Sequence, residues 1–128
     1  MCLNLKHRFV LKRKAKEDII CYKQIKKSEK SDNKYDKYET RYQLAEVVLG
    51  ATYYSTLIKR ENNRFSLRVY IGLHSYKYYI DCLRNNELPF EIVKCIIPKD
   101  SYYYEGKFQE EDSFASSKLT YVEICSKI

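Results

Sequence analysis

The chain has 128 residues, of which 45% are hydrophobic, and a formal net charge of +7. This length predicts one domain with a single core, and the many aliphatic and aromatic side chains exclude a chain that is disordered throughout. No apolar run approaches the roughly 20 residues of a membrane span, and Lys6 and Arg8 interrupt the first apolar residues, so we predict a cytoplasmic protein with no signal peptide and no membrane contact.

Residues 1–18 are predicted to form a basic N-terminal strand and connection. Hydrophobic and polar side chains alternate over residues 3–11, which is the period of a half-buried strand, and residues 12–17 form a charged connection. Residues 1–30 hold ten Lys or Arg and three acids, while the rest of the chain holds fourteen of each. The charge excess therefore lies at the N-terminus, which favours an anionic partner, although a solvated lysine-rich edge would have the same composition.

The next part of the chain alternates between strand-like and polar segments. Residues 19–25 are rich in β-branched and aromatic side chains and predict a strand. Residues 26–40 are almost entirely polar and predict a surface loop. Residues 41–49 fit either a short helix or a strand, and a strand over residues 51–58 and a turn over residues 60–63 follow.

The clearest periodic pattern predicts a strand that leads directly into a helix. Apolar and polar side chains alternate from residue 64 to residue 74. Ser75 is predicted to cap the helix that follows. The apolar stripe of this helix would consist of Tyr76, Tyr79, Ile80 and Leu83.

The C-terminal third predicts a buried strand and a final strand. Residues 90–97 are nearly all apolar, as in a central strand buried on both faces. Residues 99–106 are predicted to form a turn with exposed tyrosines, residues 110–114 an acidic loop, and residues 118–128 the last strand. Together these segments predict one α+β domain over residues 1–128, with a curved, mainly antiparallel sheet of five or six strands and one or two packed helices.

The cysteines argue against a disulfide framework or a zinc site. Five cysteines are present, an odd number, and none lies in a Cys-x-x-Cys spacing. Only two histidines, His7 and His74, are available as further metal ligands. We therefore expect small buried thiols in a reducing cytosol, with no metal and no cofactor.

Four fragments together carry a family resemblance: "LGATYY" (49–54), "GLHSY" (72–76), "KCIIPKDSYYYEG" (94–106) and "FASSKL" (114–119). In this order they resemble a group of small, mostly uncharacterised proteins of bacteriophages and gut-type bacteria. The resemblance covers about residues 19–125 and implies a mobile-element protein that works in the host cytosol against a host defence system. The group has no settled activity, so the resemblance supplies no catalytic residue, and it does not include the basic segment 1–17.

A looser resemblance concerns "GLHSYKYYIDCL", residues 72–83. A strand that ends in Gly-aromatic-His and leads into a helix is similar to the strand–helix junction of ADP-ribosyltransferase-like folds. This chain has Leu73 at the aromatic position and no Glu-x-Glu pair in a late strand. The resemblance thus concerns the fold more than the activity.

Two groups of side chains are candidates for binding an anion or a nucleic acid. The first contains the N-terminal cations Lys6, Arg8, Lys12, Arg13, Lys14 and Lys16. Lysine and arginine along one edge would contact phosphates, and such binding would weaken with salt. The second contains Arg64, Arg68, Tyr70 and His74, which share the predicted polar face of one strand. Arginine can grip a phosphate with two hydrogen bonds, and tyrosine can stack on a base.

A third candidate is a protein interface at Tyr102, Tyr103 and Tyr104. The chain has fourteen tyrosines and no tryptophan. Tyrosine is enriched at protein interfaces because it combines a rigid apolar ring with a polar tip. A general bias towards tyrosine in the composition would also explain these residues.

The sequence favours binding over catalysis. The cysteines at positions 21, 82, 95 and 125 lie at apolar pattern positions, where thiols are inert, and the acids near residue 110 look solvated. We therefore expect no catalytic residue. The leading hypothesis is a binding protein that inhibits a host defence system, as an anti-CRISPR protein does, by occupying an anionic nucleoprotein or a nucleotide messenger. The alternatives are an ADP-ribosyltransferase-like enzyme and an RNA-binding accessory protein, and the oligomeric state is left open.

Overall fold

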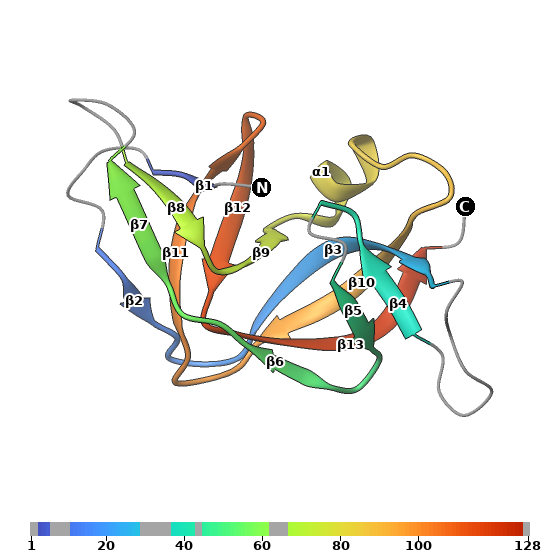
Figure 1. The fold of residues 1–128 in the computed structure, drawn as a ribbon, viewed down its shortest axis with the longest axis horizontal. Helices are drawn as coiled ribbons and strands as arrows, with labels where there is room; N and C mark the ends of the chain where they lie inside the picture. The colour runs from blue at the N-terminus through green and yellow to red at the C-terminus, as the bar shows by residue number, and fades with distance from the viewer. Residues whose placement is uncertain (1–2, 6–10, 29–36, 43–44, 62–66, 127–128) are drawn as a thin grey trace.

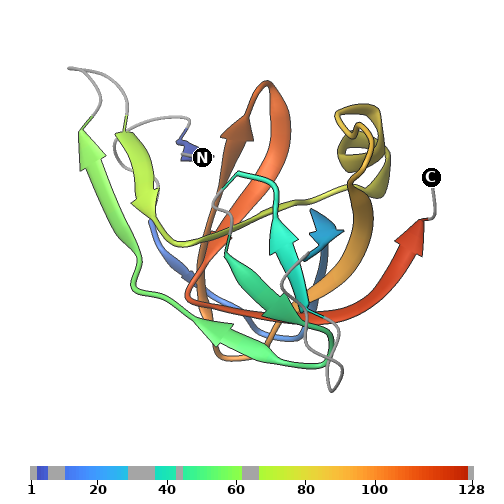
Figure 2. The same cartoon turned by 45° about the vertical axis from the view of Figure 1, so that its right-hand side comes forward.

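The computed structural model describes residues 3–5, 11–28, 37–42, 45–61 and 67–126. These residues form thirteen strands in one strongly bent antiparallel sheet, with a six-residue helix α1 (Tyr79–Arg84) at one end (Figures 1 and 2). In chain order the strands are β1 (Leu3–Asn4), β2 (Arg13–Lys14), β3 (Ile19–Lys27), β4 (Lys37–Thr40), β5 (Glu46–Val48), β6 (Thr52–Tyr54), β7 (Ile58–Glu61), β8 (Leu67–Ile71), β9 (Leu73–Tyr76), β10 (Glu91–Ile97), β11 (Tyr102–Phe108), β12 (Glu111–Ser116) and β13 (Lys118–Ser126).

The centre of the sheet is the ladder formed by β3, β10 and β13. β10 pairs with β3 without interruption from Glu91 opposite Ile25 to Ile97 opposite Ile19, and with β13 on its other edge. Because β10 is enclosed by partners on both edges, its run of apolar side chains becomes the middle of the core, as its sequence predicts. The predicted strands over residues 19–25, 90–97 and 118–128 correspond to these three elements.

The main core lies on one face of this ladder. Its buried side chains come from all three strands and from the elements that fold over them: Ala15, Cys21, Ile25, Val47, Val93, Cys95, Ile97, Phe114, Leu119 and Tyr121. Val47 and the partly buried Tyr38 belong to the β4–β5 hairpin, which therefore closes over this face. Figure 2 shows this hairpin in front of β10 and β13.

A bend at Gly72 divides the predicted strand 64–74 into two strands with different partners. β8 pairs with β1 and β7, whereas β9 pairs with β12 and β3. A Cβ atom on Gly72 would lie 2.7 Å from Cδ2 of Leu57, so glycine permits this close passage. The strand thus leaves the outer part of the sheet and enters its interior at this residue.

A tight hairpin joins β11 to β12 through Gln109 and Glu110. The ladder ends at the pair Phe108–Glu111, and both turn residues have positive φ, 49° and 70°. Positive φ at both central positions is the feature of a type I′ turn, which normally uses Asn-Gly or Asp-Gly. The chain uses neither, which is why its sequence does not show a hairpin here.

The predicted α+β class with one or two packed helices is wrong. Within the described residues the fold is almost all sheet, and its one helix is shorter than two turns. Ser75 does not cap this helix, because it lies in β9 and the helix begins after Tyr78. The predicted apolar stripe is also wrong, since Ile80 and Leu83 are exposed and Cys82 is the buried helical residue.

Several predicted loops and turns are strands instead. Tyr102–Phe108 forms β11 where a turn was expected, and Glu111–Ser116 forms β12 where an acidic loop was expected. The tyrosines favour extended structure, and three of the acids lie within ion-pair distance of a cation: Glu105 with Lys77, Glu111 with Arg84, and Asp112 with Lys107. Of the predicted polar loop 26–40, residues 29–36 lie outside the described residues, and Lys37–Thr40 forms β4. Of the predicted strand 3–11, the structure describes β1 and its surroundings but not residues 6–10.

The turn at Gln109 and Glu110 gives a stability prediction. Glu110→Gly should raise the free energy of unfolding by about 0.5 to 1 kcal/mol, because glycine adopts positive φ without the cost that a side chain carries. The measurement is urea unfolding of the variant and the parent protein. Lys99→Gly is the matched control in an exposed connection where φ is negative, and it should lower stability. Equal effects of the two substitutions would contradict the turn geometry.

Candidate anion-binding surface

The short basic strand β2 is hydrogen-bonded to β11. Lys14 of β2 is opposite Tyr102, and Arg13 is opposite Tyr103. The ladder continues at Ala15, which donates to Ser101 O at 2.8 Å and accepts from Asp100 N at 2.8 Å. Ala15 is buried while the basic residues around it are exposed, so the backbone is fixed and the charges face solvent.

A groove of about 720 Å³ opens beside this strand. It is lined by Arg13, Lys14, Lys16, Glu17, Ile19 and Tyr103. Its volume is in the range of ligand-binding clefts. Three of its lining residues are cationic and one is acidic, so its net charge is positive.

The basic side chains of the groove are not neutralised by ion pairs. Within the described parts of the chain, no carboxylate lies within ion-pair distance of Arg13, Lys14 or Lys16. The neighbouring Asp18 instead accepts a hydrogen bond from Lys99 N at 2.8 Å. These cations therefore remain available to an anion from outside.

Two tyrosines give the basic surface an aromatic component. Tyr103 packs edge-on against Phe114, with ring centroids 5.7 Å apart, which fixes its orientation at the groove. Tyr102 is 44% exposed, and the Lys12 ammonium lies 4.8 Å from its ring centroid. Tyr104, the third member of the predicted interface, is buried and contributes to the core around β1 instead. Tyr102 and Tyr104 share one face of β11 because they are two residues apart, but only Tyr104 is covered there, in the cluster that contains Leu3 and Leu5.

The structure brings together only part of the predicted anion-binding set. Lys12, Arg13, Lys14 and Lys16 are gathered at β2. Lys6, Arg8 and Arg64 lie outside the described residues. Tyr70 belongs to β8, and the exposed Arg68 donates from Nε to Asn4 Oδ1 at 2.9 Å. Asn4 is opposite Lys107, four residues along β11 from Tyr103 and about 13 Å away, so Arg68 is not part of the groove.

His74 lies in the interior rather than on an exposed polar face. It is 1% exposed, and its Nδ1 lies 3.1 Å from Gly72 O. Burial, together with the nearby Lys23 ammonium, lowers the pKa of His74 to about 4. The alternation of apolar and polar side chains predicted that His74 is exposed. This prediction fails beyond Gly72, because β9 is covered on both faces. His74 therefore cannot contact a partner surface.

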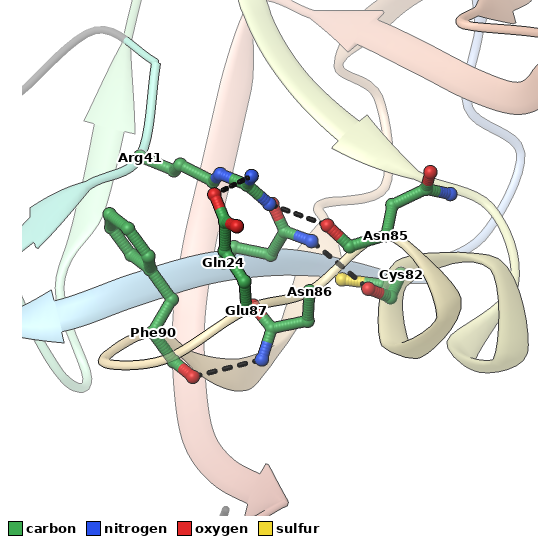
Figure 3. Close-up of polar contacts among 7 residues, drawn as sticks. All are labelled: Gln24, Arg41, Cys82, Asn85, Asn86, Glu87 and Phe90. Carbon is green, nitrogen blue, oxygen red and sulfur yellow. Dashed lines mark hydrogen bonds and ion pairs between the residues drawn. The ribbon is translucent and has the colours of Figure 1, made fainter.

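Arg41 is a partly buried cation that the sequence analysis did not identify. Its Nη1 donates to Gln24 Oε1 at 3.0 Å and to Asn85 O, and its Nη2 binds Glu87 Oε1 at 2.7 Å (Figure 3). Gln24 in turn donates to Cys82 O at 3.0 Å. Arg41 thus ties β3 and the β4–β5 connection to the end of α1. Its bonds are used within the protein, which distinguishes it from the cations at β2.

Lys23 is a buried cation that the sequence analysis also did not identify. Its ammonium donates to His74 O at 2.7 Å, at the place where β9 separates from β3. Burial lowers the pKa of Lys23 to about 8. A lowered lysine pKa is also a feature of catalytic lysines. The space beside this lysine is only about 20 Å³, the size of one water molecule, and its lining includes Lys23, Gln24, Arg41 and Tyr76. The ammonium therefore serves to bind a carbonyl of β9 rather than a substrate.

The thiols give no support to catalysis. Cys21, Cys82 and Cys95 are buried, and burial raises the pKa of the Cys21 thiol to about 12 and those of the other two as well. The thiolate is the nucleophilic form, so these residues are unreactive at neutral pH. Cys125 is exposed, unlike its predicted position. The described residues include no group of three or more acids, histidines or cysteines placed to hold a metal ion.

The segment that resembles an ADP-ribosyltransferase junction does form a strand and a helix. β9 ends at Tyr76 and α1 begins at Tyr79. His74 is buried there, and the adjoining space has a volume of about 20 Å³. Comparisons with protein-family models, curated proteins and solved structures gave no match. In the described ranges, no helix has the length and apolar character required to cross a bilayer.

The buried Lys23 ammonium gives a pH-dependent stability prediction. Its folded-state pKa of about 8 is below the unfolded value of 10.5, so the destabilisation is complete below pH 8 and is relieved as the pH rises towards 10.5. Relative to Lys23→Met, the wild-type protein should therefore gain about 2 kcal/mol of unfolding free energy from about pH 7 to about pH 9.5. Urea unfolding of both proteins at each pH measures this difference, because the other titrating groups are common to both. A difference that does not change with pH would show that the amine is not buried in this way.

Proposed function

We propose that this protein binds an anionic, nucleic-acid-containing partner through the groove beside β2. The observation that supports this proposal is the group of Arg13, Lys14 and Lys16, which are exposed, close together and unpaired with acids in the described structure. Phosphates release condensed counterions when lysine or arginine neutralises them, and this release drives binding. The basic strand is held rigidly by β11, so little ordering of its backbone opposes binding.

The partner is proposed to be a nucleoprotein of the host, and the action to be stoichiometric inhibition in the cytosol. This part of the proposal rests on the sequence resemblance to small phage and gut-bacterial proteins. The groove is compatible with it, because a guide-RNA complex or a nucleotide messenger offers the phosphates that a basic surface attracts. The tyrosines at the rim add the aromatic area that is common at macromolecular interfaces.

The test is the salt dependence of RNA binding by variants with matched charge. Arg13→Gln combined with Lys14→Gln should weaken binding of an RNA oligonucleotide. The slope of log K against log salt should fall by about 0.7 for each phosphate that the variant no longer neutralises. Fluorescence anisotropy of labelled RNA at several salt concentrations measures both effects.

The control removes the same two charges from the other end of the molecule. Arg84 in α1 and Lys37 in β4 lie away from β2 (Figure 1), and Arg84→Gln with Lys37→Gln should leave the salt slope unchanged. Equal weakening in the two double variants would mean that net charge alone drives binding, which contradicts a site at β2. Capture from a host lysate then tests the partner: retention of a nucleoprotein in preference to its free RNA supports inhibition.

A further inference from the structure

A second lysine–tyrosine pair lies beside the groove and has no role in the core. Tyr54 is 70% exposed, and the Lys118 ammonium lies 5.5 Å from its ring centroid. The two residues are directly opposite each other where β6 pairs with β13, so their side chains share one face. The arrangement repeats that of Lys12 and Tyr102.

The two pairs are joined through Ser117. Ser117 N donates to Tyr102 O at 2.9 Å, and Tyr102 N donates to Ser117 Oγ at 3.1 Å. On the other side, Ser55 N donates to Ser117 O at 2.9 Å. Two strand spacings therefore separate Tyr102 from the β6 segment, about 10 Å. β2 and β6 both lie in the lower part of Figure 1.

The result is an aromatic and cationic strip that shares Lys14 with the groove. Crossing from β2 to β6, it contains Lys12, Lys14, Tyr102, Lys118 and Tyr54. Each exposed ring has a lysine ammonium over one of its faces. A base that stacks on this face would displace the ammonium, which could then bind a phosphate of the same strand. The backbone that carries each ring is fixed by strand pairing.

We infer that this strip recognises single-stranded nucleic acid, with bases stacked on Tyr102 and Tyr54 and phosphates held by the lysines. The inference rests on the proposed function and specifies the form of nucleic acid. A duplex keeps its bases in its own stack and offers mainly phosphates, so exposed rings at a basic surface would gain little from it. Stacking does not depend on base identity, so little sequence preference is expected.

The experiment compares three polyanions of similar charge: a single-stranded oligouridylate, an RNA duplex and inorganic polyphosphate. Tyr102→Leu and Tyr54→Leu should each weaken binding of the single strand by about 5- to 150-fold, because leucine keeps the apolar bulk but removes the stacking face. Polyphosphate has no bases, and its affinity should change by less than about twofold. The chain has no tryptophan, so quenching of tyrosine fluorescence by the single strand gives a second readout of stacking.

Tyr78→Leu is the matched control. Tyr78 is 47% exposed and has the Lys77 ammonium 5.5 Å from its ring centroid, but it precedes α1 and lies away from the groove. Its replacement should leave all three affinities unchanged. Thermal unfolding of each variant shows that the fold is kept.

The outcomes separate this inference from the proposed function. If the tyrosine variants bind the single strand more weakly but bind polyphosphate as the wild type does, the result supports both the stacking inference and the proposed function. If the tyrosine variants bind the single strand as the wild type does, while Arg13→Gln with Lys14→Gln weakens it, the stacking inference is overturned and the anion-binding function stands. Equal or tighter binding of the duplex likewise overturns stacking. Failure of the wild type to bind any of the three polyanions overturns both.

Discussion

The uninterrupted pairing of β10 with β3 determines most of this structure. This ladder, extended by β13, creates one long apolar face, and the elements around it are arranged to cover that face or to continue its edges. The β4–β5 hairpin folds over the core because Val47 and Tyr38 bury apolar surface against it. At the far end, β9 must leave β3 after a single pair, and the ammonium of Lys23 binds the carbonyl that this separation would otherwise leave unpaired.

The distribution of hydrogen bonds among the cations indicates which of them can serve a partner. Arg41 is bound on both terminal nitrogens, Lys23 is buried, and Lys107 pairs with Asp112 at 2.6 Å. The cations at β2 have no such partner in the described structure, although the backbone beneath them is fixed by β11. Unpaired charges on a fixed backbone are favourable for binding an anion, because no existing ion pair is broken and little backbone has to be ordered on association. The exposed tyrosines on the same side add aromatic rings to this charged surface.

The candidate site could be predicted from the sequence only in part. The clustering of lysine and arginine before residue 17 is a local property, and it led to the residues at β2 that the structure brings together. Tyr54 and Lys118 are 64 residues apart and become neighbours only through the pairing of β6 with β13, so no local pattern could connect them to Tyr102. His74 shows the opposite error. Its alternation pattern placed it on an exposed face, but the bend at Gly72 moves it to a strand that is covered on both sides.

The sequence by itself determined the elements whose signal is local and continuous: the strands β3, β10 and β13, and the basic character of the N-terminal segment. A run of β-branched side chains or of like charges needs no distant partner to be recognised. Only the tertiary structure decided that Tyr102–Phe108 and Glu111–Ser116 are strands, because their turn uses Gln109 and Glu110 in place of the usual asparagine and glycine. It also decided that the described residues contain one short helix, since the energy of pairing an edge with a neighbouring strand exceeds the weak helical preference of a short segment.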